Sequence, residues 1–569
     1  MLYTAHNFDS SKAGFEHIMQ RNFDALGSDT FDLAIIGGGA TGAAIAFDAS
    51  LRGLRVAVVD KGDFGGATSA GSTKLMHGGL RYLANGEMRL VREGLRERRH
   101  WARMAKHLVH PLPFIMPSYN HQKPSRLTLG LGLGLYDWLG FDRNRAVDAM
   151  QKMPGYRSMT VAQTMGLIPD LPRQLDSDTA QARPKLTAGL LYHDGQMLSP
   201  ERLCLALIRS AVAAGAVAVN HSEAGAFLIE DNRCVGFEVK DRLSHKRLQL
   251  RAAMTINAGG PWADHIMSAA DKMPAGKKLV RSKGIHIVTR NLTRGAALAM
   301  PLDDEHIFIT PYMGMSLLAT TDTKFDDAPD AACVTKQDID ALLAKANRAL
   351  PDAKLTRKDV VYAYVGLRPL VTDMDDRPDT TYGLSRGSEI YDHAKQGGVH
   401  GMISALGGKW TTARRLAEQV VDLAIEKLDS KPIRCRSHLT ALECTPRDDL
   451  GHFMDAMRAA YPKHDTASID LMSRLYGRLL PTMMATDTNG LTALKDDLLA
   501  ARIAFAVSDE MAMTLEDIVL RRLIEGQIGA LTSSQIDIIE DWLQSRLGHS
   551  EAEMKRQRKA LNNKLKVPR

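Results

Sequence analysis

Residues 31–51 place a buried-strand pattern, a glycine cluster and a helix of small residues directly after one another. Phe31–Ile36 predicts a strand, the sequence G-G-G-A-T-G follows at residues 37–42, and residues 43–51 have the small apolar side chains of a closely packed helix. Gly37 permits a tight turn, Gly39 lets a pyrophosphate approach the backbone, and Gly42 lets the helix lie close to the sheet. A second strand over residues 55–59 ends at Asp60, whose carboxylate suits a ribose hydroxyl and repels a 2′-phosphate. The segment therefore predicts a dinucleotide site for NAD or FAD rather than NADP.

A second, longer motif follows at residues 67–83. It consists of A-T-S-A-G-S-T-K-L-M-H-G-G-L-R-Y-L and closely resembles the flavin-contacting segment of the FAD-dependent glycerol-3-phosphate dehydrogenases. Four later blocks resemble that family's remaining motifs and keep their order: residues 257–262 (N-A-G-G-P-W), 320–322 (T-T-D), 365–370 (V-G-L-R-P-L) and 407–412 (G-G-K-W-T-T). The resemblance extends over about residues 31–560 and implies FAD as the cofactor, bound without a covalent bond.

Composition narrows the setting of the protein. The chain has 569 residues, 44% of them apolar, so several sizeable cores can form. Its five cysteines are scattered and show no C-x-x-C spacing, which indicates a reducing, cytoplasmic compartment and argues against disulfides and metal sites. No stretch approaches the roughly 18 uncharged apolar residues of a membrane span. The net charge of +7 is spread along the chain without a nucleic-acid module, so an anionic substrate and anionic lipid explain it better.

The order of the motifs predicts an α/β fold. A Rossmann-like FAD-binding domain, of the glutathione-reductase or D-amino-acid-oxidase type, is expected to be interleaved with a mixed-sheet substrate domain. Residues 285–288, 307–309 and 317–320 predict strands of that second sheet, and helical spacing after residue 435 predicts a C-terminal all-α domain. The expected limits are 1–27 for an N-terminal extension, 28–110, 190–275 and 360–428 for the FAD-binding domain, 111–189 and 276–359 for the substrate-binding or cap domain, and 429–569 for the helical domain.

The family resemblance implies a reaction. It is the oxidation of sn-glycerol 3-phosphate to dihydroxyacetone phosphate, with hydride transfer to flavin N5 and electrons passed to quinone at the inner face of the cytoplasmic membrane. Arg81 matches the arginine of the family's H-G-G-L-R-Y motif, Arg368 that of its G-x-R-P motif, and Lys409 its G-G-K lysine. Because a guanidinium can hold a phosphate bidentately, these cations would select a phosphorylated polyol. Tyr82 and Thr321 are also expected beside the substrate.

Two histidines are candidates for contact with the reacting groups. His77 precedes the glycine pair of the H-G-G motif, where the resembling family brings backbone close to the flavin, and is favoured for flavin contact. His286 begins a predicted strand and is the better candidate near the alcohol, while Asp322 helps to close the pocket. Together with Arg368 these histidines form the expected catalytic set, although the sequence does not identify the base.

Further residues are expected to contact FAD. The small side chains and hydroxyls of the 67–83 motif suit close packing against a large planar cofactor, and no cysteine lies there for covalent attachment. The glycines at 407–408 bring a helix N-terminus toward the flavin, where its positive end favours an anionic reduced flavin. The expected cofactor set is Gly37, Gly39, Ala40, Thr41, Gly42, Asp60, Lys61, Thr68, Ser69, Ser72, Lys74, His77, Gly78, Gly79, Ala258, Gly259, Gly408, Lys409, Trp410 and Thr411.

Other functions stay open at this point. The chain departs from the family pattern at Gly71 and Gly259, and Trp410 could reshape the pocket, so a dehydrogenase of another polyol phosphate, such as erythritol phosphate, is an alternative. A glycerol-3-phosphate oxidase that passes electrons to oxygen is another. A third hypothesis is a non-catalytic, flavin-binding redox-sensing module, in which the three cations would have no evident purpose. The oligomeric state is open, a homodimer included.

Four stretches outside these motifs also carry expectations. Residues 127–141, apolar and glycine-rich with flanking arginines, predict buried core first and an interfacial membrane element second. The arginines of residues 89–99 alternate with glutamates and predict a solvated helix face with i,i+4 pairs. The basic residues 551–569 predict a solvated or frayed end. Near the N-terminus, Phe15, Ile18 and Met19 predict one short amphipathic helix.

Overall fold

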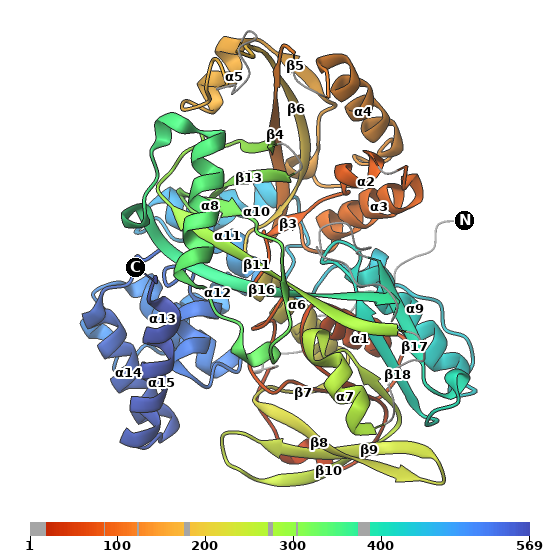
Figure 1. Cartoon of the computed structure of the whole chain (residues 1–569). Coiled ribbons are helices and arrows are strands. Elements are labelled where there is room, and N and C mark those ends of the chain that lie inside the picture. Colours follow the sequence, from red (N-terminus) through yellow and green to blue (C-terminus); the bar gives the residue numbers. More distant parts are fainter. Residues whose placement is uncertain are drawn as a thin grey trace.

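Two large sheets form the body of the molecule, and the last helices of the chain gather at one side (Figure 1). The structure, a computed structural model, describes residues 19–84, 86–121, 124–175, 183–270, 277–302, 305–373 and 387–568. Phe15 and Ile18 of the expected N-terminal helix lie outside the described residues, and Met19 is buried in the main core.

The first sheet carries the glycine motif. In the described residues its path is β17–β18–β10–β1–β2–β7, parallel from β18 to β7, and β8 and β9 extend it antiparallel from β10. Helices α1 (Ala40–Leu51), α6 (Pro200–Ala213) and α9 (Ala413–Lys427) pack together in the main core. The strands are β1 (Thr30–Ile36), β2 (Val56–Val59), β7 (Val217–Val219), β8 (Ser222–Glu230), β9 (Arg233–Asp241), β10 (Arg247–Asn257), β17 (Ser388–Asp392) and β18 (Met402–Gly407).

The glycine motif folds as its spacing predicts. β1 ends at Ile36, Gly37 turns the chain with a φ of +103°, and α1 begins at Ala40. A Cβ atom at Gly42 would overlap the carbonyl oxygen of Gly37, so only glycine lets the helix start this close to the turn. The predicted strand, helix and second strand are confirmed as β1, α1 and β2, and they form the expected Rossmann-like unit.

The second sheet is mostly antiparallel. In the described residues it runs β15–β11–β14–β13–β12–β4–β6–β3, with β16 paired to β11 and β5 to β6, and β12 and β4 are parallel neighbours. Helix α8 (Lys336–Ala349) shares an apolar core with this sheet. The strands are β3 (Leu75–Met76), β4 (Val109–Tyr119), β5 (Arg157–Met159), β6 (Leu186–Met197), β11 (Lys277–Thr289), β12 (Ala297–Leu302), β13 (Glu305–Tyr312), β14 (Met315–Ala319), β15 (Thr323–Phe325) and β16 (Val360–Asp373). Residues 285–288 and 307–309 lie in β11 and β13, and the strand predicted at 317–320 lies in β14 apart from its last residue.

The expected limits of the FAD-binding domain differ from the sheets at three strands. β16, expected in that domain within 360–428, pairs along its length with β11 of the second sheet. β6 continues through 190–197 in the same second sheet, and β3 at residues 75–76 pairs with it. The expected limits were drawn from the positions of the motifs. Backbone hydrogen bonds determine which sheet a strand belongs to, and they continue past those limits.

A close backbone contact joins the two sheets. Residues 65–79, which we call the flavin segment, follow β2 and lie against β16. A Cβ atom at Gly71 would be 2.6 Å from the Val365 carbonyl oxygen, and one at Gly366 would overlap the Gly71 carbonyl oxygen. Next to this contact, Thr68 Oγ1 donates a hydrogen bond to the Leu367 carbonyl at 2.7 Å. The flavin segment is therefore fixed on β16 by contacts that leave no room for a side chain.

The C-terminal part is helical, as expected. The basic end predicted to be solvated or frayed instead forms the last helix, with Met554 and Leu561 buried in a core that also contains Val288 of β11 and Tyr362 of β16. The two apolar residues are seven apart and share one helix face, which outweighs the surrounding lysines. The helices are α10 (Leu450–Ala460), α11 (Thr466–Tyr476), α12 (Leu480–Met484), α13 (Asp497–Asp509), α14 (Ser533–Leu547) and α15 (Glu551–Leu565), with a π-helical turn at Asp517–Arg522.

Buried ion pairs attach this helical part to the first sheet. Asp63, in the turn after β2, lies 2.6 Å from Arg522 and 3.1 Å from Arg521 of the π-helical turn. Asp517 of the same turn pairs with His221 at 2.8 Å. Burial disfavours the charged imidazole, but Asp517 outweighs it and raises the pKa of His221 above its ordinary value. Loss of one partner would leave an uncompensated buried charge, so these pairs hold the helices in one position.

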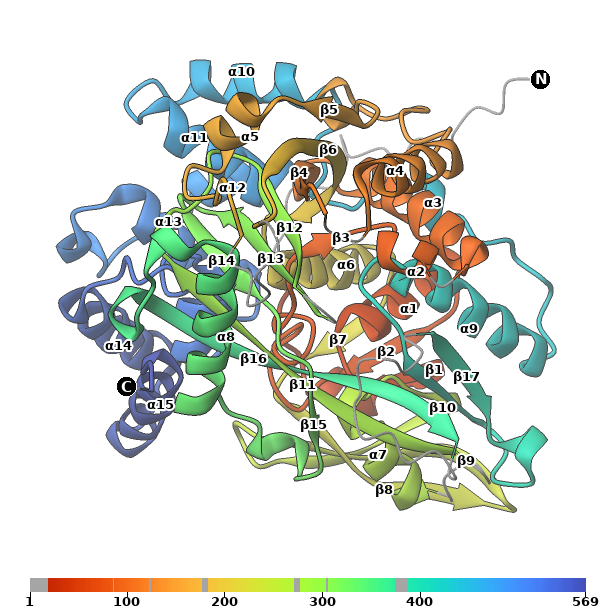
Figure 2. The same cartoon turned by 45° about the horizontal axis from the view of Figure 1, so that its top comes forward.

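Three helices lie together at one end of the molecule, α2 (Leu80–Ala84), α3 (Met88–Met104) and α4 (Arg126–Leu139) (Figure 2). The apolar stretch expected as buried core forms α4 and its C-terminal flank, and that expectation is wrong for one face. Leu127, Leu131, Trp138 and Phe141 are 67–74% exposed, because α4 is covered on one side only. No helix in the described ranges is long and apolar enough to cross a membrane. Two short helices complete the set, α5 (Val161–Leu167) and α7 (Ala263–Ala270).

The solvated face predicted for the arginines of α3 is also wrong in part. Arg98 is buried and pairs with Asp194 of β6 at 2.5 Å. Glu97 is buried and pairs with Arg414 of α9 at 2.6 Å. These partners are distant in sequence, so helical spacing alone cannot reveal them.

We expect Gly366→Ala to separate the flavin segment from β16, because the new methyl group has to displace the Gly71 backbone. Overpacking of this kind costs about 1–3 kcal/mol of unfolding free energy. The variant should melt at a lower temperature and retain less of the predicted cofactor, measured by calorimetry and by flavin absorbance relative to protein absorbance.

A matched control is Gly166→Ala in α5, where a Cβ atom meets nothing within 4 Å. It should keep wild-type stability and flavin content. Unchanged melting and flavin content in Gly366→Ala would show that the contact is not tight.

Candidate active site

The nucleotide end of the site lies at the N-terminus of α1. The N-cap, Gly39, provides no side-chain cap, and the first N–H of the helix donates to Ser69 Oγ at 2.9 Å. Asp60 accepts hydrogen bonds from the N–H groups of Gly38 at 2.7 Å and Gly62 at 2.8 Å. Burial raises the pKa of Asp60 above its ordinary value, against the lowering effect of these two bonds. A helix N-terminus, a hydroxyl and a carboxylate at one place fit the pyrophosphate and ribose of a dinucleotide.

Ala258 and Gly259, two further residues expected at the cofactor, lie at this same end. A Cβ atom at Gly37 would be 2.6 Å from the carbonyl oxygen of Ala258, which places residues 258–259 directly beside the glycine turn. Thr41 lies in the first turn of α1 and is half-buried. The three segments that carry nucleotide-binding candidates therefore converge.

Two lysines expected at the cofactor have other partners. Lys61 Nζ is 2.8 Å from Asp330, in the loop after β15. Lys74 is buried, its Nζ lies 3.3 Å from Glu201, and the same ammonium group is 5.4 Å from the centre of the Tyr364 ring. The structure thus commits both ammonium groups to carboxylates, which sequence spacing does not reveal.

The G-G-K-W-T-T block contacts the flavin segment. The two glycines at 407–408 have φ of +68° and +97° and turn the chain from β18 toward α9. Trp410 Nε1 donates to the Ser69 carbonyl at 2.9 Å, and Thr411 Oγ1 donates to the His77 carbonyl at 3.1 Å. The structure therefore brings together the two motifs that were expected on either side of the flavin.

Arg368 has a defined set of partners. Its guanidinium lies over Gly284 of β11, where a Cβ atom would overlap it. Nη1 donates to Ser282 Oγ at 3.1 Å and to the Thr321 carbonyl at 3.2 Å, and Nη2 donates to Thr320 Oγ1 at 2.8 Å. These bonds fix the plane of the guanidinium over β11.

His286 lies on β11, two residues after the glycine that the Arg368 guanidinium covers. Its Nε2 is 3.1 Å from Thr73 Oγ1 of the flavin segment, and its ring stacks on Tyr364 with 4.8 Å between centroids. Burial, Arg368 and Lys74 keep the pKa of His286 well below its ordinary value, so the ring is neutral at pH 7. Its Nδ1 is buried and has no hydrogen-bond partner within the described part of the chain. A neutral imidazole with an unused nitrogen can accept a proton.

The remaining predicted substrate residues cluster around one ring. Lys409 Nζ lies 3.8 Å from the centre of the Tyr82 ring, and the Arg81 guanidinium carbon lies 5.7 Å from it. Tyr82 is buried, so the two cations approach a desolvated aromatic face. Positive charge from α2 and from the β18–α9 turn is therefore concentrated in one place.

Ser282 and Tyr364 were not among the residues predicted from sequence, and Thr73 was expected to contact the cofactor but not His286. Two-residue alternation could have found the first two, because Ser282 and Tyr364 share their strand faces with His286 and Arg368. The hydroxyl of Tyr364 donates to the Ser72 carbonyl of the flavin segment at 2.9 Å. Thr73 lies inside a recognised motif, but its pairing with a residue more than two hundred positions away has no local signal.

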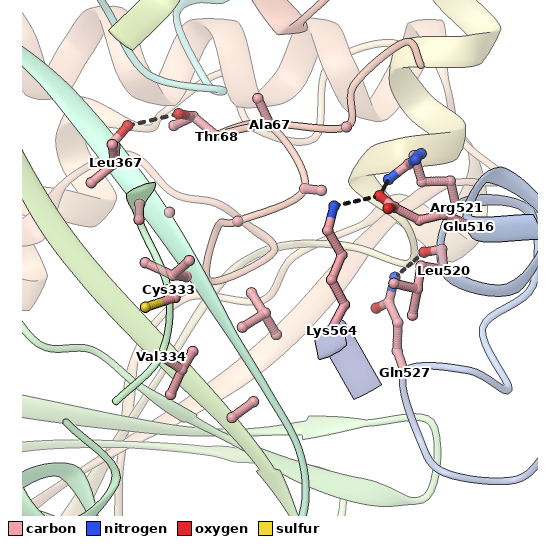
Figure 3. A pocket seen from close by; sticks show the side chains of 18 of the residues that line it. Ala67, Thr68, Cys333, Val334, Leu367, Glu516, Leu520, Arg521, Gln527 and Lys564 are labelled. Carbon is pink, nitrogen blue, oxygen red and sulfur yellow. Dashed lines mark hydrogen bonds and ion pairs between the residues drawn. The ribbon is translucent and has the colours of Figure 1, made fainter. Parts of the chain in front are cut away.

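A cavity of about 390 Å³ lies beside the flavin segment (Figure 3). Ala67 and Thr68 line it from the flavin segment, Leu367 from β16, and Arg521 and Lys564 from the C-terminal helices. Lys564 and Arg521 both contact Glu516 there. Arg81, Arg368 and Lys409 are not among the residues that line this cavity, whereas Lys74 and Tyr364 are.

Comparison with known proteins identifies the family. Residues 32–414 match the family described as FAD dependent oxidoreductase. A glycerol-3-phosphate dehydrogenase of Synechocystis is 33% identical over 522 residues, which cover 88% of this chain and 90% of the relative. The chain belongs to the FAD-dependent glycerol-3-phosphate dehydrogenase family.

Solved structures agree with this membership. The glycerol-3-phosphate dehydrogenase from Bacillus halodurans, solved in complex with FAD, matches with a TM-score of 0.76 at 26% identity and covers 95% of each chain. An L-alpha-glycerophosphate oxidase from Mycoplasma pneumoniae shares the fold, with a TM-score of 0.51 at 15% identity, over 72% of this chain and 98% of its own. The family membership and the interleaved α/β fold with its C-terminal helices are confirmed, and the cofactor is FAD.

We expect Asp60→Asn to weaken FAD binding. The amide would direct its NH₂ group at backbone N–H groups that now donate to a carboxylate, and charge-assisted hydrogen bonds of this kind are worth about 1.5–3 kcal/mol. The dissociation constant of FAD, measured by recovery of flavin fluorescence on dialysis, should rise by roughly tenfold or more.

Asp29→Asn is the matched control, since Asp29 forms an exposed pair with Arg55 outside the nucleotide end. Its FAD affinity should equal that of the wild type. An unchanged dissociation constant in Asp60→Asn would remove Asp60 from the cofactor set.

Proposed function

We propose that this protein oxidises sn-glycerol 3-phosphate to dihydroxyacetone phosphate and passes the electrons to a membrane quinone. The observation that carries the proposal is the grouping of Arg368 with a neutral His286 beside the flavin segment. Family membership supports it, because the Synechocystis relative is named a glycerol-3-phosphate dehydrogenase.

Arg81 and Lys409 bind the phosphate in this proposal. A phosphate monoester carries about 1.5 to 2 negative charges at pH 7. Each charge-assisted hydrogen bond contributes about 1.5–3 kcal/mol, so two cations favour a phosphorylated polyol over free glycerol by about a hundredfold or more. Tyr82 holds both cations near its ring and limits their motion.

Arg368 and His286 act on the alcohol. Arg368 orients the secondary hydroxyl, and His286 takes its proton as the carbonyl forms. FAD, when bound, supplies the acceptor for the carbon-bound hydrogen, which leaves as hydride. The lowered pKa keeps His286 unprotonated at neutral pH, and the fixed guanidinium stabilises negative charge on the oxygen.

The proposal of a quinone acceptor and of a membrane position is based on the exposed surface of α4. Leu127, Leu131 and Trp138 project from one face of that helix and Phe141 follows it, all largely exposed. Arg126 and Arg145 flank them and are also exposed, as suits an anionic lipid surface. We place this end of the molecule on the inner face of the cytoplasmic membrane, as a peripheral attachment.

Transfer of electrons to oxygen is the second candidate, favoured by the fold shared with the Mycoplasma oxidase.

Anaerobic titration of the FAD-loaded protein tests the reaction. Glycerol 3-phosphate should bleach the flavin absorbance, whereas free glycerol and erythritol phosphate should not. Arg81→Ala should keep its FAD and raise the KM for glycerol 3-phosphate by roughly tenfold to a hundredfold, because a charge-assisted contact to phosphate is lost.

Arg89→Ala is the control for Arg81→Ala, since Arg89 is an exposed arginine of the neighbouring helix α3. Bleaching by erythritol phosphate alone would transfer the mechanism to another substrate. Flavin that stays oxidised with every polyol phosphate would contradict an enzymatic role and leave the redox-sensing module. Reoxidation by air as fast as by a soluble quinone would identify an oxidase.

We expect a Leu131→Glu and Trp138→Glu double variant to lose affinity for anionic phospholipid vesicles. Burial of such side chains is worth about 1.5–3 kcal/mol each when complete, so partition into vesicles should fall by roughly tenfold or more. Vesicle co-sedimentation measures this, and the activity with a soluble quinone should stay unchanged.

Ile229→Glu on β8 is the matched control, because Ile229 is an exposed apolar residue that lies away from α4. It should sediment with vesicles as the wild type does. Equal partition of the double variant and the wild type would refute attachment through α4.

A further inference from the structure

The peptide group between His77 and Gly78 of the flavin segment is hydrogen-bonded at both of its polar atoms. The carbonyl of His77 accepts from Thr411 Oγ1 at 3.1 Å, and the N–H of the next residue, Gly78, donates to Asp194 Oδ1 at 3.1 Å. Both atoms belong to the same planar peptide unit. The two partners come from different parts of the fold, Thr411 from the turn before α9 and Asp194 from β6 of the second sheet.

Asp194 is buried, and both of its carboxylate oxygens accept hydrogen bonds. Besides the Gly78 N–H, its carboxylate accepts from Arg98 Nη1 of α3 at 2.5 Å and from the Tyr136 hydroxyl of α4 at 2.8 Å. Burial opposes the charge on Arg98, but Asp194 raises its pKa above the ordinary value, so the ion pair is retained. Burial and the neighbouring carboxylate raise the pKa of Tyr136 well above its ordinary value, which keeps its hydroxyl a donor.

Glycines close the space around this peptide. A Cβ atom at Gly78 would overlap the Tyr136 hydroxyl. A Cβ atom at Gly94 of α3 would be 2.8 Å from the Gly78 carbonyl oxygen, and one at Gly195 would be 2.8 Å from the Met76 carbonyl oxygen. Helix α3 and strand β6 therefore approach the flavin segment at backbone distance on either side of the His77–Gly78 peptide.

We propose that Asp194 is a positioning residue for substrate binding, which fixes the orientation of the His77–Gly78 peptide and thereby the placement of His77 and Arg81. Arg81 follows only three residues later, at the start of α2, so its direction depends on how the chain leaves this peptide. A rotated peptide would leave the buried Asp194 facing a carbonyl oxygen and the Thr411 hydroxyl facing an N–H group. Both arrangements lose hydrogen bonds that burial makes costly to lose.

The inference rests on the proposed function, since it assigns Asp194 a part in binding glycerol 3-phosphate. One consequence does not depend on the substrate: the backbone of the flavin segment should change when Asp194 or Tyr136 is altered. Two kinds of readout therefore test it separately.

Tyr136→Phe, Asp194→Asn and Thr411→Val are compared with the wild type as FAD-loaded proteins. We expect the KM for glycerol 3-phosphate to rise by about fivefold in Tyr136→Phe and by about tenfold or more in Asp194→Asn, with a smaller change in kcat. Visible circular dichroism of the flavin and the dissociation constant for sulfite, which adds to the flavin, should shift in the same order. Thr411→Val, which frees the other end of the peptide, should change all readouts in the same direction.

Tyr119→Phe is the matched control. Tyr119 is buried in the second sheet, and its hydroxyl donates to the Pro172 carbonyl at 2.8 Å. It should lose about as much thermal stability as Tyr136→Phe, while its KM and sulfite affinity stay at wild-type values.

Wild-type KM and sulfite affinity in folded Tyr136→Phe and Asp194→Asn would overturn the assignment. If Asp194→Asn fails to fold, Tyr136→Phe and Thr411→Val decide it alone. If the wild type does not oxidise glycerol 3-phosphate, the proposed function fails, while the dichroism and sulfite readouts still report whether Asp194 fixes the peptide.

Discussion

The contact between Gly71 and Gly366 is the constraint on which the arrangement of the site depends. It sets the flavin segment against β16 at a distance that excludes any Cβ atom. Neither glycine needs a left-handed conformation, so space alone requires them. Because the contact is backbone to backbone, it does not relax by rotation of side chains, and Thr73 of the flavin segment can therefore reach His286 of β11. The dinucleotide unit and the catalytic candidates are thus held as one body.

The charged side chains near the contact between Gly71 and Gly366 keep His286 neutral. Arg368 and Lys74 both lie near His286, and together with burial they keep its pKa well below the ordinary value. Lys74 also forms an ion pair with Glu201, so its ammonium group lowers the pKa of His286 while a carboxylate already occupies it. The same use of paired charges appears at the nucleotide end. There Asp63, three residues after Asp60, is held by the C-terminal arginines. The helical part therefore helps to shape the turn after Asp60, the carboxylate that is expected to bind the nucleotide.

The sequence predicted the features that depend on local order. The glycine turn, the position of Asp60 and the strand carrying His286 follow from periodicity and from the steric needs of short motifs. It could not predict the partners of Lys61 and Lys74, because each meets a carboxylate brought in by tertiary folding. The same limit applies to α4 and α15, which are both amphipathic. Helical spacing shows that a helix has an apolar face, but not whether the fold covers it, and here α15 is docked while one face of α4 is exposed.

Helix α4 has different roles on its two faces. Its inner face carries Tyr136, whose hydroxyl bonds Asp194 and through it the Gly78 backbone. Its outer face carries Leu131 and Trp138, which the proposed function places at a lipid surface. A helix of fourteen residues is rigid over this length, so a shift of the outer face would also shift the Tyr136 hydroxyl. That hydroxyl has a buried partner, and leaving the partner unsatisfied is costly. In the proposed function the same helix therefore carries both the face that meets the lipid and the hydroxyl that holds the Gly78 backbone, which ties the two properties to one structural element.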